Sequence, residues 1–500
     1  MNPSQNLFYL IKSLSANEKR YFKMYCSLQS GDKNYLRLFE AIDEISEYDE
    51  TLIKEQFKKE KFIRQLTFTK NYLYNLIFKS LYSYYSKHSI ESRLNDLVFR
   101  CCYFYKKALF KEFRHSIDLG KKLSLEYERF GYFIQFSSYE KILLIEKIFP
   151  VVDEKSILLQ EELTSEKISN LFVYESFAAM LTGIYREEGR TRDKALFQYI
   201  ERIKQSPLLT SENYALSSLA KERYYFLLQL ISDIYGDFDN MYKYCRKRLE
   251  VMEADPKPFS DRIYNYWRDT LMYLILLSIR LDKQEKLIKY LNLLEMHSND
   301  TASDKIYLFL VQSYLSIQLI ITEKRWDKVN ELMESIEKGL KMYKGKMDSN
   351  FEIILYDLIA RMLVESGQYN SSLVYINLLL QHPYISIRRD IEYNARLLNL
   401  IIHYELNNFE YLEYLIISTY RFLYKRKKIY KLETLVINFI KQLSKVNTNE
   451  DLIDNFKILQ KELKQIYVKP HEKNVFLYFN YPEWVNKKLK EIQQKHYSIR

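Results

Sequence analysis

The chain has 500 residues, of which 47% are apolar and 28% are charged, and its formal net charge is +11. This balance excludes an intrinsically disordered chain, which would combine few apolar residues with a high net charge. Only 9 glycines and 8 prolines are present, far below the roughly 7% and 5% that are usual. Because β-rich folds need these residues for their turns, the composition predicts an all-α protein.

The N-terminal sequence shows no secretory signal, since no basic segment precedes an apolar core and a small-residue cleavage site. The longest unbroken apolar run, from Leu271 to Leu277, is far shorter than the ~20 residues of a membrane span. The four cysteines include no CxxC pair, which is consistent with free thiols in a reducing compartment. We therefore expect a soluble, cytoplasmic protein.

Residues 1–88 are predicted to form an N-terminal helical module. Ser15 followed by Glu18 matches the capping-box pattern, which predicts a helix that begins at Glu18. Three more helices are expected, near Tyr35 to Ile45, from Asp49, and from Ile63 to Ser86.

Residues 89–466 are predicted to form an α-solenoid, because apolar stripes at helical spacing fall into pairs separated by short breaks. Two helices joined by a short turn fold back antiparallel. One such hairpin cannot bury both of its stripes, so it needs neighbours of the same kind. The second helices are expected to begin at intervals of 40 to 46 residues, at Phe238, Gln284, Trp326, Tyr369 and Phe409.

Weaker pairs precede these, with breaks near Leu109 and Gly189 and a further pair between Tyr132 and Leu163. They bring the total to about eight pairs. Prolines are expected to mark the ends of second helices, since proline cannot continue a helix. These are Pro150, Pro207, Pro256, Pro258 and Pro383.

The pair at residues 350–383 carries the most specific pattern of bulky and small residues. Its marked positions are Tyr356, Ile359, Ala360, Leu363, Gly367, Tyr369, Ser372 and Pro383. In this pattern the pair resembles a tetratricopeptide repeat, although the other units are longer than that motif. The resemblance implies a right-handed superhelical solenoid of antiparallel helix pairs, whose concave groove binds a protein or peptide. Because Ala360 and Ser372 are small, we expect the closest helix–helix approach of the array here.

Residues 467–500 are predicted to form a C-terminal cap. A break at Lys469 and Pro470 is followed by a short apolar run, and Pro482 opens a last helix with one apolar stripe and a lysine-rich outer face.

The sequence contains no motif that would support catalysis. It has no glycine-rich phosphate loop, no HExxH or HxxxH pair, and no GxSxG elbow. We therefore expect a protein that is not an enzyme and has no catalytic residues, no cofactor and no metal site.

The leading hypothesis is a protein- or peptide-binding scaffold or adaptor that uses the concave face, which first helices line. Polar or aromatic residues near the predicted inner face of first helices are the candidate groove residues. They are Tyr356, Arg361, Asn394 and His403. The partner's identity and the oligomeric state stay open.

Positive charge gathers near the C-terminal end, where residues 421–500 hold 18 lysines and arginines against 8 acidic residues. One interpretation is a solvated helix end whose cations oppose the helix dipole. The other is a docking surface for an acidic protein or a nucleic acid. The densest cluster, called the basic cluster below, comprises Arg421, Lys425, Arg426, Lys427, Lys428 and Lys431.

The alternative hypothesis is a nucleic-acid-associated regulator. Its N-terminal module would be a helix-turn-helix variant in which the segment from Thr67 to Tyr72 opens the recognition helix, and its repeats would sense a peptide. The modest positive charge of residues 1–88, 14 basic against 10 acidic residues, argues against it.

Overall fold

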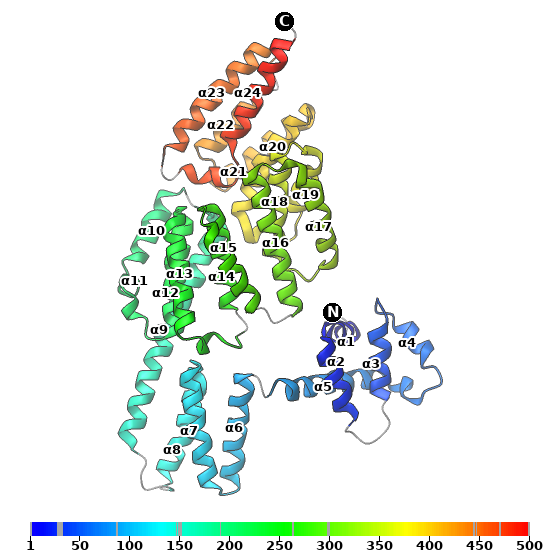
Figure 1. Ribbon diagram of the computed structural model, residues 1–500, viewed down its shortest axis with the longest axis vertical. Coiled ribbons are helices and arrows are strands. Elements are labelled where there is room, and N and C mark those ends of the chain that lie inside the picture. Colours follow the sequence, from blue (N-terminus) through cyan, green and yellow to red (C-terminus); the bar gives the residue numbers. More distant parts are fainter. Residues whose placement is uncertain are drawn as a thin grey trace. The chain divides into compact units, whose positions relative to one another are not determined.

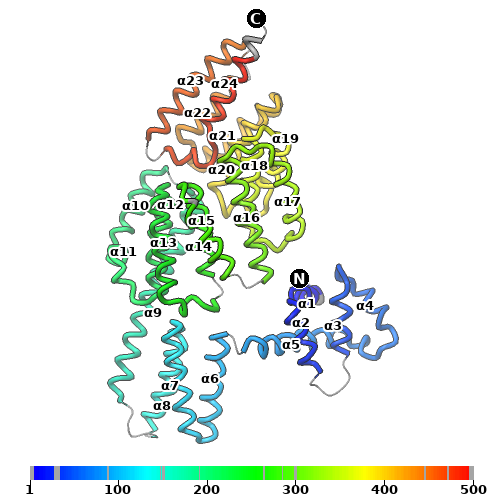
Figure 2. The backbone as a smooth tube through the Cα atoms, viewed as in Figure 1, coloured from blue at the N-terminus to red at the C-terminus, as the bar shows by residue number. Residues whose placement is uncertain are grey.

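The computed structural model describes residues 3–27, 34–86, 89–146, 148, 153–190, 192–262, 265–297, 301–443, 446, 448–469 and 472–498. Within these ranges every regular element is a helix (Figures 1 and 2), which confirms the predicted all-α class. Residue contacts divide the chain into two compact units. Unit 1 comprises residues 1–168 and 256–264, and unit 2 comprises residues 169–255 and 265–500. The division into three domains stays a prediction.

Unit 1 begins with five helices, one more than predicted. They are α1 (Pro3–Ser13), α2 (Ala16–Ser27), α3 (Asn34–Glu44), α4 (Glu50–Gln56) and α5 (Leu66–Tyr85). The predicted capping box is confirmed: the Ser15 amide donates to Glu18 Oε2 at 2.6 Å, and the Glu18 amide donates to Ser15 Oγ at 3.3 Å. Phe22, Phe39 and Ile77 are fully buried in a core that α2, α3 and α5 share.

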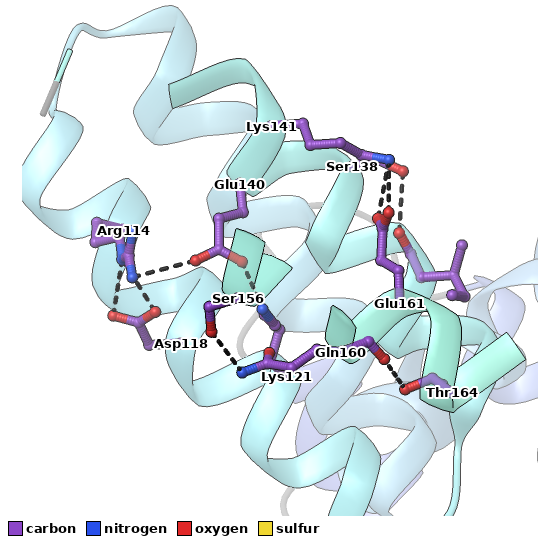
Figure 3. Close-up of polar contacts among 11 residues, drawn as sticks. Arg114, Asp118, Lys121, Ser138, Glu140, Lys141, Ser156, Gln160, Glu161 and Thr164 are labelled. Carbon is purple, nitrogen blue, oxygen red and sulfur yellow. Dashed lines mark hydrogen bonds and ion pairs between the residues drawn. The ribbon is translucent and has the colours of Figure 1, made fainter. Parts of the chain in front are cut away.

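The remaining helices of unit 1 are joined by buried charge as well as by apolar contacts. They are α6 (Ile90–Lys106), α7 (Phe110–Glu126), α8 (Phe130–Ile145) and the first part of α9 (Glu154–Glu188). Glu140 of α8 accepts from Lys121 at 2.5 Å and pairs with Arg114 at 3.2 Å, both on α7 (Figure 3). Lys141 of α8 pairs with Glu161 of α9 at 2.9 Å. Because Glu140 is buried, its two cations are needed to offset its desolvation.

Helix α9 corrects one prediction. Residues 154–188 form a single helix of 35 residues, so the expected boundary after Leu163, between the pair at residues 132–163 and the pair around Gly189, does not exist. Thr164, the residue directly after the expected boundary, is buried, and its hydroxyl donates to the carbonyl oxygen of Gln160 at 2.7 Å. This bond satisfies the hydroxyl within the helix. Pro150, the expected end of a helix before it, lies outside the described residues, as does Pro470.

Unit 2 consists of helices packed in neighbouring pairs (Figure 1). Extensive contacts join α12 to α13, α14 to α15, α18 to α19, and α23 to α24, and α20 also contacts α21. This arrangement is compatible with a helical repeat. In chain order the helices are α10 (Lys194–Lys204), α11 (Pro207–Thr210), α12 (Ser218–Tyr235), α13 (Phe238–Ala254), α14 (Tyr266–Arg280), α15 (Gln284–Met296), α16 (Ala302–Glu323), α17 (Val329–Met342), α18 (Ser349–Glu365), α19 (Tyr369–Leu380), α20 (Arg389–Glu405), α21 (Phe409–Lys425), α22 (Lys431–Leu443), α23 (Asn449–Tyr467) and α24 (Tyr481–Ser498).

The predicted starts of the second helices are confirmed. Helices α13, α15, α19 and α21 begin at the four expected residues, and Trp326 begins a 3-10 turn (Trp326–Lys328) that leads into α17. Each start follows the same turn, in which a residue with positive φ lies two positions earlier. The residues in this left-handed conformation are Gly236, Asp282, Lys324, Gly367 and Asn407.

The hydrogen bonds of these turns are also the same. The amide after the left-handed residue donates to a carbonyl oxygen five residues earlier, as from Gln368 to Leu363 at 2.8 Å and from Asn408 to His403 at 3.0 Å. This is the Schellman bond that ends many helices, usually with glycine in the left-handed position. Here one turn geometry recurs along unit 2, although glycine occupies only some of its positions.

The pair α18 and α19 shows the close contact that its small residues predict. Ala360 and Ser372 are fully buried, and Ser372 Oγ donates to the carbonyl oxygen of Ala360 at 2.8 Å. A bond from a short side chain to the backbone of the facing helix requires the two helices to approach closely. That this approach is the closest of the array stays a prediction.

Helix α16 is, by length and composition, the one helix in the described part of the chain that could cross a membrane. Core helices of soluble proteins meet the same criterion. Leu310, Ile317 and Ile320 of α16 belong to the largest buried cluster of unit 2.

Candidate ligand-binding cleft

Two of the four predicted groove residues are held in local contacts. Tyr356 is half-buried, and its hydroxyl donates to Glu352 Oε1 at 2.6 Å. His403 is buried, and its Nδ1 lies 3.1 Å from Asn408 Nδ2. Burial lowers the pKa of His403, so this imidazole is neutral at pH 7 and supports the turn between α20 and α21.

The other two, Arg361 and Asn394, lie where the C-terminal segment crosses unit 2. Arg361 Nη1 donates to the carbonyl oxygen of Tyr478 at 3.2 Å, and its Nη2 donates to Asp357 Oδ2 at 2.5 Å. Asn394 Nδ2 donates to the carbonyl oxygen of Asp390 at 2.7 Å, and the Tyr478 hydroxyl donates to Asp390 Oδ2 at 3.1 Å. The chain's own C-terminal segment therefore covers the face that Arg361 was predicted to offer to a partner.

This segment also contacts other helices of unit 2. Asn474 Nδ2 donates to the carbonyl oxygen of Tyr235 at 3.4 Å, and Trp484 Nε1 donates to Glu405 Oε1 at 2.7 Å. The residues before α24 thus contact the ends of α12 and α18, and α24 itself contacts α20.

A cluster of charged side chains surrounds a cavity of about 30 Å³ beside Tyr478. Arg192 pairs with Glu433 through both carboxylate oxygens, one of them at 3.0 Å, and Lys428 pairs with Glu188. A cavity of this size holds about one water molecule. We call Glu188, Arg190, Arg192, Asp390, Glu433 and Tyr478 the inner polar cluster. It joins the end of α9 to α20 and α22, and it is a structural support because its charges are paired.

Glu365, at the end of α18, gives unit 2 a dependence on pH. Burial, together with the neighbouring Glu483, raises the pKa of Glu365 to about 7, although Arg361 and Lys324 oppose the shift. Between the pKa of the unfolded chain, near 4.5, and about 7, the folded state binds more protons than the unfolded state. Stability therefore falls as pH rises through this range.

The prediction is that Glu365→Gln removes this loss. The free energy of unfolding of the variant, relative to that of the wild type, should rise by on the order of 2 kcal/mol from pH 5 to pH 8, because a pKa unit corresponds to about 1.4 kcal/mol. Urea unfolding at both pH values measures the difference. An equal difference between variant and wild type at pH 5 and pH 8 would contradict the assignment.

The basic cluster is divided by the structure into paired and unpaired residues. Lys428 pairs with Glu188, and Lys431 pairs with Glu462 at 3.3 Å. The guanidinium of Arg426 lies 3.8 Å from the ring centre of Phe422. Arg421, Lys425 and Lys427 are exposed and make no ion pair with the part of the chain that the structure describes.

A cleft with a volume of about 550 Å³ lies between α22 and α23 of unit 2. Tyr430 lines both this cleft and the small cavity of the inner polar cluster. Phe439 and Leu459 form a buried apolar floor, and Ile458 on the rim is 62% exposed. The volume falls within the range of pockets that bind small molecules or side chains, about 300–1,000 Å³.

Polar side chains at helical spacing form one wall of this cleft. Lys431, Thr434, Asn438 and Gln442 follow one another along α22, and all are exposed. Asn438 and Gln442 make no side-chain hydrogen bond with the described residues, whereas Asn455 on the opposite helix donates to the carbonyl oxygen of Asp451 at 2.8 Å. An amide side chain can donate and accept at once, so this row can pair with the backbone of an extended chain.

The start of α22 is fixed by the inner polar cluster. The Tyr430 amide donates to Glu433 Oε2 at 3.3 Å, and the guanidinium of Arg192 lies 4.4 Å from the ring centre of Tyr430. The paired charges thus fix the position of Tyr430 and Lys431, which form one end of the cleft.

Among the predicted residues, only Lys431 lines the cleft. The row of Thr434, Asn438 and Gln442 was missed, although its spacing of four residues on one helix face could have indicated it.

Searches against models of protein families, curated proteins and solved structures found no match to this chain.

Proposed function

We propose that the protein is a non-enzymatic scaffold that binds an extended segment of another protein, and that the cleft between α22 and α23 is its binding site. The cleft carries the proposal, because it combines an apolar floor with two amide side chains, Asn438 and Gln442, that make no side-chain hydrogen bond with the described residues. Apolar side chains of the ligand fit the floor, and its backbone pairs with Asn438 and Gln442.

Charge favours an acidic residue at one end of this ligand. Lys431 lines the cleft and is 42% exposed despite its pair with Glu462. Lys427 lies nearby in sequence and is exposed. Such rim charges raise the association rate and fix the orientation of the ligand more than they raise its affinity.

The proposed architecture around the cleft is a tetratricopeptide-like solenoid with antiparallel pairs and a right-handed superhelix. The recurring turns and the packing of neighbouring helices support it. In this architecture ordered helices present the site with little ordering cost on binding.

The test begins with peptides selected from a random-sequence display library on the full-length protein. Fluorescence anisotropy then measures the affinity of a selected peptide for the wild type and for Asn438→Ala and Gln442→Ala. Each variant should bind roughly fivefold more weakly, because each loses a hydrogen bond worth about 1 kcal/mol.

A matched control is Asn377→Ala, which removes an exposed asparagine from α19 and should leave the affinity unchanged. The proposal fails if no peptide is selected, or if the selected peptides bind both cleft variants as tightly as the wild type.

The nucleic-acid alternative has less support. Lys70, which lies in the segment expected to open a recognition helix, is buried and donates to Glu50 Oε2 and to the Tyr48 hydroxyl, each at 2.6 Å. A lysine held in this way is not available to a phosphate. Binding of the full-length protein to random duplex DNA at low salt would nevertheless favour the alternative.

A further inference from the structure

One face of helix α21 carries both apolar and charged side chains, and no described part of the chain covers it. Its opposite face is buried through Leu412, Ile416 and Leu423. Tyr414, Ile417 and Tyr424 are 66%, 51% and 68% exposed. At 100° per residue, the following residues share the exposed face: Glu410, Glu413, Tyr414, Ile417, Tyr420, Arg421, Tyr424 and Lys425.

Charge is distributed on this face in two halves of opposite sign around Ile417. Glu410 and Glu413 precede Ile417, and Arg421 and Lys425 follow it. These four residues are exposed and form no ion pair with any described residue. Glu413 lies four residues before Ile417 and Arg421 lies four residues after it, so the two are at equal distances from Ile417 along the helix.

This pattern is complementary to itself. If two copies of α21 pack antiparallel around a two-fold axis at Ile417, Glu413 of each copy faces Arg421 of the other. Tyr414 then lies beside Tyr420 of the other copy, and the two Ile417 side chains meet at the axis. Each contact occurs twice, as an isologous interface requires.

We propose that this face of α21 binds a second copy of the chain and forms a two-fold symmetric dimer. The mixture of charges favours this occupant over a nucleic acid, which the acidic half would repel. The aromatic side chains supply the apolar contact area, and the charges fix the antiparallel direction.

The dimer is expected to be reversible. A helix of 17 residues is about 25 Å long, and one such face buries less than the ~800 Å² per partner of a standard stable interface. Dissociation in the micromolar range follows, so the dimer should form and separate over accessible protein concentrations.

Sedimentation velocity of the full-length protein, from about 1 to 200 µM, measures this equilibrium. The wild type should change from monomer to dimer across the range. Ile417→Asp should stay monomeric, because it places two like charges at the axis. Ile288→Asp is the matched control, since Ile288 of α15 is 69% exposed on another helix, and it should dimerise as the wild type does.

A charge exchange tests the orientation. Glu413→Arg and Arg421→Glu should each weaken dimerisation roughly tenfold, because like charges then face each other at two places. The double variant should recover the affinity of the wild type. A wild type that is monomeric at every concentration overturns the proposal, as does a folded double variant that dimerises no better than the single variants. Neither result depends on ligand binding at the cleft.

Discussion

Replacing Arg248 by methionine is expected to lower the free energy of unfolding of unit 2 by about 3–5 kcal/mol, because it removes the closest cation of a buried carboxylate. Arg248 is 0% exposed, and it donates to Glu222 Oε1 at 2.8 Å, Gln229 Oε1 at 2.7 Å and Asp269 Oδ2 at 2.9 Å. These bonds connect α13 to α12 and α14. Glu222 is also fully buried, and once Arg248 is lost its remaining ion pair is the longer one, at 3.6 Å, with Arg223.

Urea unfolding measures this loss against a neighbour on the same helix. Arg246 is exposed and pairs with half-buried Glu250 at 3.2 Å, so Arg246→Met should cost less than about 1 kcal/mol. The double variant Arg248→Met/Glu222→Gln should be more stable than Arg248→Met alone, since it removes the buried charge that has lost its closest partner. A cost for Arg248→Met that equals the cost for Arg246→Met would show that the buried charges do not stabilise the packing of these helices.

Replacing Arg192 by methionine is expected to weaken both the fold and ligand binding. Glu433 is buried and would lose both hydrogen bonds from Arg192, which should cost about 3 kcal/mol. Glu433 caps the start of α22 through the Tyr430 amide, and Arg192 also packs on the Tyr430 ring. Because Tyr430 lines the cleft, the affinity for a selected peptide should fall although Arg192 does not line it.

The matched control is Arg202→Met on α10, since Arg202 is exposed and forms no ion pair with the described residues. It should change neither stability nor affinity. Peptide binding by Arg192→Met is measured below its unfolding transition, so that lost affinity is separated from lost folding. Wild-type affinity in a folded Arg192→Met protein would show that the inner polar cluster does not position the cleft.

The sequence predicted the helices of unit 2 because their apolar stripes are regular and their breaks are short. Phe409, for example, begins α21 as expected after Asn407 and Asn408. The residue in the left-handed position of each turn was harder to predict. Asp282, Lys324 and Asn407 occupy this position, although the left-handed conformation costs energy for residues other than glycine. Because glycine is absent there, the sequence does not reveal that these turns have the same geometry as those with glycine.

Local patterns failed where tertiary contacts decide the structure. The polar residues from Thr164 to Glu166 look like a helix boundary, yet α9 continues through them, and Glu161 pairs with Lys141 of the preceding helix. Helix α1 was missed because its sequence offers no clear cap. Its Leu7 and Ile11 are buried against the other helices of the N-terminal bundle, a contact that only the folded chain reveals.

The candidate site was the least predictable part. Arg361 lies on a first helix as expected, but contacts with Leu477 and Tyr478, more than a hundred residues later, occupy its guanidinium. The spacing of residues along one helix cannot show such a contact. The cleft exists because α22 and α23 are separated next to Phe439 and Leu459. The periodicity of apolar residues in the sequence does not predict the distance between two helices.

Photo-crosslinking tests the proposed function most directly. A peptide selected on the full-length protein, carrying a photoreactive residue at its most apolar position, is bound and irradiated, and mass spectrometry locates the attachment. If the peptide binds in the cleft, it should attach within residues 429–442, which comprise α22 and its preceding turn, or within residues 455–459 of α23. The double variant Asn438→Ala/Gln442→Ala should lose this attachment. Attachment confined to other helices, unchanged in that double variant, would contradict a peptide-binding site between α22 and α23.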